Sequence, residues 1–186
     1  MKKLKNYIYI FAMLAMAGLM ASCSGDSDEL PSAVAQQVRE QMRGNYTGDL
    51  TYGTADNPAQ NIAEGVGAVS ADSLTIALPL DAVAEQMGDA DIANSLRSIG
   101  TIKVRAAYKF LKDRQGGIKY RLVPTLAERI EVPQHDIKFN FSNNYIGEYY
   151  DNSIECRIGV ERVSIDGKAA QGFRAVVYRY KSTPRR

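Results

Sequence analysis

Few residues in this sequence have the types and spacing that catalysis or metal binding requires. His135 is the only histidine, and it lies beside Asp136. A catalytic histidine also needs a nucleophile and an orienting group nearby in space, and no motif in the sequence supplies them. The chain has no paired histidines, no Cys-x-x-Cys spacing and no Asp-rich calcium loop. We therefore predict that the protein is not an enzyme and has no catalytic residues, no metal site and no cofactor.

Three tyrosines are the best candidates for ligand binding. Tyr145, Tyr149 and Tyr150 lie close together in a polar segment that contains a glycine. A tyrosine ring has apolar faces and a polar rim, so exposed rings suit stacking on sugars or peptides. We predict a binding loop here, with the alternative that the rings pack over the core or a barrel mouth. Glu148 and Asp151 lie among them, but glycoside chemistry needs two carboxylates at a defined separation, and exposed loop positions explain both more simply.

Cys23 is the third residue of chemical interest, because it closes an apolar leader. Three lysines lie within residues 2–5, an apolar run over residues 7–19 is too short to span a bilayer comfortably, and Leu-Met-Ala-Ser-Cys follows. This pattern resembles a bacterial lipoprotein signal, with methionine where leucine is more usual. The resemblance implies that residues 1–22 are a signal peptide and that Cys23 is the lipidation site. Acyl chains on Cys23 would then hold the protein on the membrane.

The residues that follow Cys23 indicate where the anchored protein lies. Ser24 occupies the position at which an aspartate would suggest retention in the inner membrane, so the resemblance favours the outer membrane. Asp26, Asp28 and Glu29 resemble the acidic surface-export signal of Bacteroidetes-type lipoproteins, although a solvated acidic linker has the same composition. We expect residues 23–31 to be the lipidated cysteine with a flexible tether, and the protein to face either the periplasm or the cell surface.

Charge and length exclude several other classes of protein. The chain has 23 basic and 21 acidic residues, and the leader holds three of the lysines, so the mature protein is close to neutral. No block of lysine or arginine suggests a nucleic-acid footprint, so nucleic acid is not an expected partner. Residues 32–186 have the length of one ordinary domain.

Cys156 lies two residues from both Ile154 and Ile158 in an alternating run, so the three side chains share one face of a strand. This predicts a buried, unreactive thiol.

Most of the domain has the two-residue alternation of β-strands. Residues 32–43 carry an apolar stripe that predicts a helix, and residues 81–87 and 91–98 predict two short helices that cover one end of the fold. Asp166-Gly167 favours a tight type I′ hairpin. The predicted strands cover residues 46–52, 62–70, 74–78, 102–110, 118–122, 136–141, 153–164 and 168–181.

About eight antiparallel strands joined mostly by short turns can close into a barrel, which removes exposed edges. The run from Gly44 to Leu50 resembles the first strand of lipocalin- or calycin-like barrels, and the whole chain resembles small calycin-like lipoproteins of Bacteroidetes. The chain has no tryptophan, which departs from the ligand-carrying lipocalins. We expect a mainly β calycin/lipocalin-like barrel with an N-terminal helix and short helices after the third strand. A two-sheet β-sandwich is the alternative, since alternation does not distinguish the two.

These features lead to two hypotheses for function. In the first, a lipid-anchored envelope protein binds a small apolar ligand or an envelope component, such as another envelope protein. In the second, it is a structural or accessory subunit of an outer-membrane surface complex. An eight-stranded barrel holds either packed side chains or one small ligand, so a filled interior would contradict a ligand inside the barrel.

Overall fold

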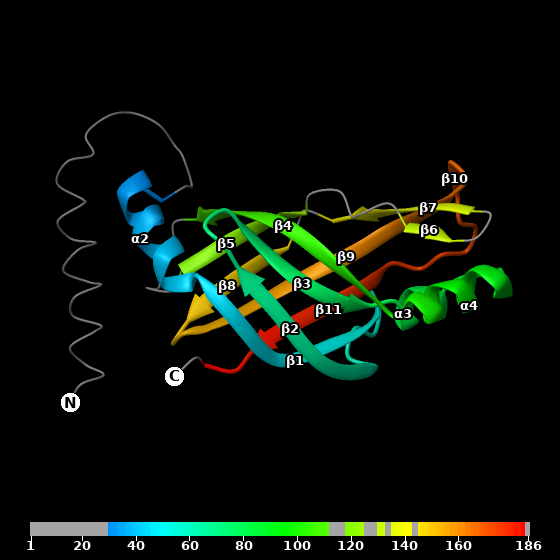
Figure 1. Cartoon of the computed structure of the whole chain (residues 1–186), viewed down its shortest axis with the longest axis horizontal. Helices are drawn as coiled ribbons and strands as arrows, with labels where there is room; N and C mark the ends of the chain where they lie inside the picture. The colour runs from blue at the N-terminus through cyan, green and yellow to red at the C-terminus, as the bar shows by residue number, and fades with distance from the viewer. Residues whose placement is uncertain (1–29, 112–117, 125–129, 133–134, 143–144, 185–186) are drawn as a thin grey trace.

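The computed structural model describes residues 30–111, 118–124, 130–132, 135–142 and 145–184. In this part of the chain, helices accompany one antiparallel sheet of 11 strands (Figure 1). No helix among these residues is long and apolar enough to cross a membrane. The elements in chain order are α2 (Ser32–Met42), β1 (Gly44–Thr54), β2 (Asn61–Val69), β3 (Ser73–Pro79), α3 (Asp81–Ala84), α4 (Ala90–Ile99), β4 (Thr101–Leu111), β5 (Ile118–Pro124), β6 (Ile130–Val132), β7 (His135–Phe141), β8 (Ile146–Tyr150), β9 (Ser153–Ile165), β10 (Lys168–Ala169) and β11 (Val176–Ser182).

The sheet closes on itself as a barrel. Hydrogen-bonded neighbours follow the order β1-β2-β3-β4-β5-β8-β9-β11, and β11 pairs with β1 through Tyr52 and Tyr178 among other partners. Every pairing is antiparallel. The expected calycin/lipocalin-like barrel is therefore confirmed, and the sandwich alternative is wrong, because a sandwich would leave two separate sheets.

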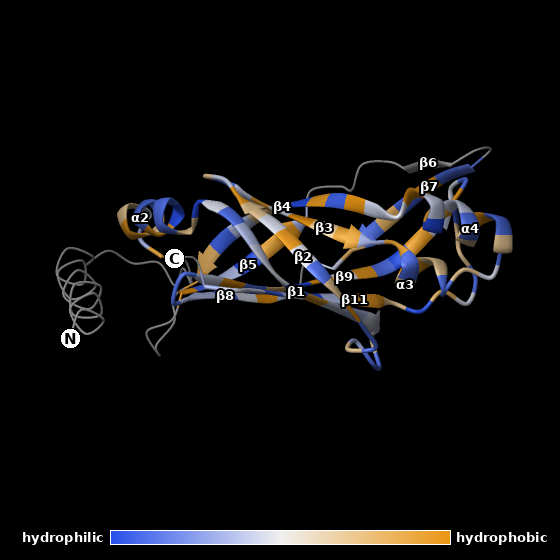
Figure 2. Ribbon diagram, turned by 60° about the horizontal axis from the view of Figure 1, so that its bottom comes forward, coloured by the Kyte–Doolittle hydropathy of each residue, from blue (hydrophilic) through white to orange (hydrophobic). Residues whose placement is uncertain are grey.

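The alternation in the sequence decides which side chains face inward. Along β4, buried Val104, Ala106, Tyr108 and Phe110 alternate with more exposed residues, as the pattern of that segment predicts. Hydrophobic and hydrophilic segments accordingly alternate along several strands in Figure 2. The barrel core is built from these inward rows.

The last strands extend beyond the barrel. The 13-residue β9 pairs first with β8 and then with β7, which also pairs with β6 (Figure 1). Asp166 and Gly167 have φ values of 51° and 79°, as a type I′ turn requires, so the predicted hairpin is confirmed. The prediction of one strand over residues 168–181 is wrong. The chain leaves β9 after β10 and turns at Gly172, with φ 72°, before β11 begins.

Helices cover both ends of the barrel (Figure 1). At one end, Met42 of α2 is fully buried, and its carbonyl oxygen accepts a hydrogen bond of 2.6 Å from the Tyr46 hydroxyl. At the other end lie α3 and α4, with Val83 and Leu96 fully buried. Asp89 caps α4, because its carboxylate accepts from two backbone N–H groups of the first turn. The predicted helical cover is present, although α3 is shorter than expected.

Candidate functional site

The three candidate tyrosines lie on a strand and its edge rather than in a loop. Tyr149 and Tyr150 belong to β8, and Tyr145 immediately precedes that strand. Tyr149 points inward, and its hydroxyl donates to the Gln41 carbonyl oxygen over 3.3 Å. The same hydroxyl oxygen lies 3.1 Å from Asn152 Oδ1. Tyr150 is 60% exposed, and Tyr145 is partly exposed. The structure thus brings two of the three rings to the outer surface and the third to the barrel end beneath α2.

The sequence did not predict β6 or β8, and of these two only β8 belongs to the closed barrel. Its five residues give only a brief alternation, and Gly147 interrupts it. A usable signal lies at the following turn, where Asp151 and Asn152 have φ values of 48° and 59°. Aspartate and asparagine tolerate this left-handed conformation, so this pair marks a tight hairpin into β9.

Tyrosine rings fill the barrel where glycines make room for them. Gly65 on β2 faces the buried Tyr180 ring, and a Cβ atom there would lie 2.5 Å from Tyr180 Cε2. Gly147 on β8 faces the Tyr120 ring in the same way, also without space for a Cβ atom. Gly147 is the direct cross-strand partner of Tyr120, and only β1 separates β2 from β11, so these glycines admit large rings from strands close to their own.

The side chains around the interior have almost no accessible surface. A void large enough for a ligand would leave exposed area on the side chains that surround it. Six of the eight barrel strands instead contribute side chains that are at most 1% exposed, namely Leu50, Ile76, Val104, Tyr120, Ile154 and Tyr178. At the level of these side chains the barrel is filled, which removes the site that the interior-ligand hypothesis needs there.

Cys156 belongs to this filled interior. It is 1% exposed. The expectation of a buried cysteine, drawn from the face that it shares with Ile154 and Ile158, is confirmed. Burial raises the pKa of its thiol far above the ordinary range. Since the thiolate is the nucleophile, this residue is suited to packing rather than to chemistry.

His135 has a partner outside the barrel proper. Its Nδ1 atom lies 2.7 Å from Asp166 Oδ2, while the Asp136 backbone N–H donates to the other carboxylate oxygen over 2.8 Å. The backbone hydrogen bond from Asp136 and, next, the hydrogen bond with His135 lower the pKa of Asp166. These contacts hold the start of β7 against the β9–β10 turn. Within the described ranges, no group of three or more histidine, cysteine, aspartate or glutamate residues is placed to hold a metal ion.

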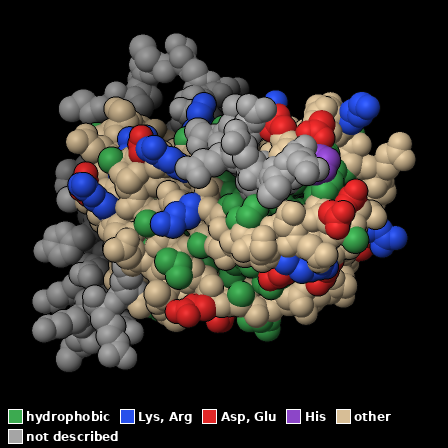
Figure 3. Space-filling view, turned by 45° about the vertical axis from the view of Figure 1, so that its right-hand side comes forward, with side chains coloured by type: hydrophobic (Ala, Val, Ile, Leu, Met, Phe, Trp, Pro, Cys, Tyr) green, Lys and Arg blue, Asp and Glu red, His purple; other side chains and the backbone are tan. Residues whose placement is uncertain are grey.

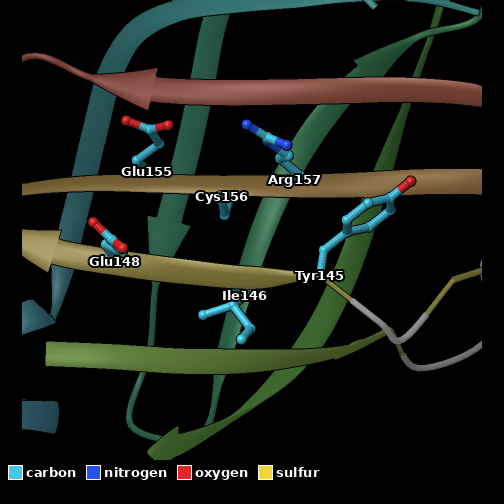
Figure 4. A pocket seen from close by; sticks show the side chains of 6 residues that line it. All are labelled: Tyr145, Ile146, Glu148, Glu155, Cys156 and Arg157. Atoms are coloured by element: carbon cyan, nitrogen blue, oxygen red, sulfur yellow. The ribbon is translucent and has the colours of Figure 1, made fainter. Parts of the chain in front are cut away.

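A pocket lies on the outer wall of the barrel between β8 and β9. Its volume is about 350 Å³, near the lower end of the range for ligand sites. Figure 4 shows the side chains that surround it, with Tyr145 reaching from the start of β8 across to β9. Cys156 also belongs to the lining, although its thiol is buried inside the barrel. The lining residues are Tyr145, Ile146, Glu148, Glu155, Cys156 and Arg157.

Gly159 determines the position of the Tyr145 ring. A Cβ atom at Gly159 would lie 2.7 Å from Tyr145 Cε2 and 3.1 Å from its hydroxyl oxygen, so only glycine allows the ring to lie on the strand there. Tyr145 is partly exposed and lines the pocket, so part of its surface stays accessible. Ile146, which is 48% exposed, adds an apolar surface beside it.

The charged groups of the pocket are only partly paired. Arg179 donates to Glu155 Oε1 from Nε over 2.9 Å and from Nη2 over 2.5 Å. Glu148 lies directly opposite Glu155 across the β8–β9 ladder. Arg157 is exposed and has neither an ion pair nor a side-chain hydrogen bond with any residue that the structure describes. The pocket therefore combines an aromatic ring, two carboxylates and an available guanidinium group.

The outer surface also has exposed apolar residues on the opposite wall. Ile62 and Val66 of β2 are 73% and 50% exposed. Four steps along the sheet separate β2 from β8 in either direction around the barrel. Figure 3 shows one side of the molecule, where hydrophobic side chains lie among acidic and basic ones.

Cys23 lies outside the described residues, so the lipidation site stays a prediction from the sequence. Comparisons of the chain with family models, with curated proteins and with solved structures found no match. The pocket between β8 and β9, with the groups around it, is therefore the candidate site.

Proposed function

We propose that this chain is a lipid-anchored cell-envelope protein, not an enzyme, that binds an envelope component through the outer wall of its barrel. The contrast between the two sides of the wall carries this proposal. Side chains that are at most 1% exposed fill the interior, whereas Tyr145, Ile146 and Arg157 line an open pocket outside. A filled barrel has few ways to bind a ligand other than on its surface.

The proposed anchor would keep the outer pocket close to the membrane. Nine residues from Cys23 to the start of α2 span at most about 30 Å when extended. Tyr149 of β8 hydrogen-bonds to Gln41 of α2, so the pocket strand and the tethered helix share one end of the barrel. We place the protein at the outer membrane, with exposure at the cell surface suggested by the acidic residues after Cys23.

The second candidate function is that of an accessory subunit in an envelope complex. The exposed Ile62 and Val66 on β2 favour it, because apolar side chains on an outer wall suit contact with another protein. If this function holds, replacing both residues with serine removes a stoichiometric protein partner and leaves the monomer folded.

Native mass spectrometry of the full protein, gently extracted from its own envelope, tests the proposed function. We expect a chain that begins at Cys23, carries the mass of two or three acyl chains and retains an envelope component. The matched Cys23→Ser variant should lose the acyl mass and leave the membrane fraction. An unacylated native protein, or an apolar molecule of a few hundred daltons held inside the barrel, would contradict the proposal.

A further inference from the structure

The outer wall around β8 carries positive charge that the opposite wall lacks. Lys109, Arg121, Arg157 and Arg179 are all exposed, and we call them the basic row. Lys109 is the direct cross-strand partner of Arg121, and Arg157 is the direct partner of Arg179. Strands β1, β2 and β3 contain no lysine or arginine at all. The positive charge is thus concentrated on one side of the barrel.

The basic row places two arginines on either side of the pocket strand. Arg121 is the register partner of Ile146, and Arg157 lines the same pocket as Ile146. Neither arginine has an ion pair or a side-chain hydrogen bond within the described part of the chain. Like charges directly opposite each other destabilise a sheet, and a bound anion would relieve that repulsion. Guanidinium groups bind carboxylate, sulfate or phosphate through paired hydrogen bonds.

The other pocket groups suit a sugar ring rather than a bare anion. Tyr145 lies against Gly159, is partly exposed and lines the pocket, so its ring offers an apolar surface for the C–H face of a sugar. Glu148 and the second oxygen of Glu155 are available to accept hydrogen bonds from hydroxyl groups. The same carboxylates repel a dense polyanion, so they select a ligand whose negative charges are spaced apart.

From these observations we infer that the outer pocket between β8 and β9, together with the neighbouring Arg121 of β5, binds an acidic sugar unit of an anionic polysaccharide. Tyr145 stacks on the ring, Arg121 and Arg157 hold its anionic group, and the glutamates accept its hydroxyl groups. This inference depends on the proposed function and names the class of envelope component. An anionic lipid surface is the competing partner, and the outcome of the experiment separates the two.

Titration calorimetry on the acylated full-length protein in detergent tests the inference with a galacturonic acid trimer. A neutral galactose trimer, inorganic phosphate and vesicles containing phosphatidylglycerol are the comparison probes. We expect the acidic trimer to bind and the other three to bind at least about tenfold more weakly, since only the acidic trimer offers the arginines an anionic group and Tyr145 a sugar ring together. We also expect its affinity to fall as salt is raised.

Variants assign the binding to the pocket. Arg157→Gln and Arg121→Gln should each weaken binding of the acidic trimer about tenfold or more. The matched control Arg162→Gln removes an exposed arginine of β9 outside the pocket and should leave the affinity unchanged. Tyr145→Ala should also weaken binding, and Tyr145→Phe should restore it, because stacking needs the ring and not the hydroxyl group.

Several results would overturn the inference. These are no binding of the acidic trimer, equal binding of the neutral trimer or of phosphate, tighter binding to the vesicles, or equal loss in the Arg162→Gln control. The same preparation reports acylation and bound envelope material by native mass spectrometry. If both are present and the trimer does not bind, the inference fails alone, whereas an unacylated protein means that the proposed function has failed.

Discussion

A tyrosine ring lies against a glycine on both sides of the barrel wall, inside and outside, with opposite consequences. Inside, Gly65 receives the ring of Tyr180, which is 1% exposed. Outside, Gly159 receives the ring of Tyr145, which stays partly exposed. In each pair, glycine lets a tyrosine ring from another part of the barrel wall lie against its strand. Protein covers the inner ring almost completely and so fills the core, whereas the outer ring keeps part of its surface accessible.

The two pairs differ in what they contribute to stability. A buried aromatic side chain removes about 150–250 Å² from water, which is worth several kcal/mol. The Tyr145 ring gains less because it is only partly covered. We therefore expect loss of an inner ring to destabilise the protein and loss of the outer ring to affect binding.

The largest expected effect is at Tyr120. This side chain is fully buried, and its hydroxyl donates to the Glu155 carbonyl oxygen over 3.0 Å. Tyr120→Ala should lower the free energy of unfolding by about 3–5 kcal/mol, measured by urea denaturation. Tyr150→Ala, at an exposed position of β8, should change it by less than about 0.5 kcal/mol. Equal effects of the two substitutions would contradict the assignment of inner and outer rings.

Adding one methyl group under an inner ring should have the next largest effect. Gly65→Ala places a Cβ atom against Tyr180, and overpacking of this kind costs about 1–3 kcal/mol. Gly88 is the matched control, because a Cβ atom there meets nothing within 4 Å. Thermal unfolding should show a lower midpoint for Gly65→Ala and little change for Gly88→Ala. An unchanged midpoint for Gly65→Ala would mean that the Tyr180 ring has room to move.

Two inner hydroxyl groups should respond in opposite ways to removal. Tyr178 donates to the Pro79 carbonyl oxygen over 2.7 Å, so Tyr178→Phe should cost about 1 kcal/mol. The Tyr180 hydroxyl is buried without a hydrogen-bond partner in the described residues. Tyr180→Phe should be neutral or stabilising, because it removes a polar group that burial penalises. Urea denaturation of both variants distinguishes the two, and a clear loss in Tyr180→Phe would reveal a partner for that hydroxyl.

The smallest expected effect is the pH dependence from Asp166. Hydrogen bonds from the Asp136 backbone and with His135 lower the pKa of Asp166 in the folded state. Its contribution to stability is therefore present above the ordinary pKa of aspartate, about 3.9, and is lost as pH falls through the folded value. Asp166→Asn should flatten the stability profile below about pH 4. If the free energy of unfolding falls equally with decreasing pH in the variant and in the parent protein, this carboxylate does not contribute.

The sequence predicts those parts of the fold that depend on local pattern. Alternation marks the inward row of β4, and Asp166-Gly167 marks the type I′ turn. Closure depends on β11 meeting β1, a pairing of Tyr178 with Tyr52 that joins opposite ends of the chain. No local pattern records such a contact, which is why the sequence is compatible with both a barrel and a sandwich.

The candidate site was only partly predictable for the same reason. The sequence singled out Tyr145 and Tyr150, and both rings reach the surface. Tyr149 instead follows the alternative of a ring packed at the barrel end. The sequence could not say which ring does so, because inward and outward positions follow from the strand register of β8. The contact of Tyr145 with Gly159 and the proximity of Arg157 lie across strands, so they required the tertiary structure.

Gly159→Val tests most directly the claim that the barrel is filled inside and binds outside. A side chain there displaces the Tyr145 ring into solvent without entering the core. We expect the free energy of unfolding to change by less than about 1 kcal/mol, while calorimetry shows loss of galacturonic acid trimer binding. Binding that survives Gly159→Val in a folded protein would contradict the account and would place the ligand site elsewhere on the molecule.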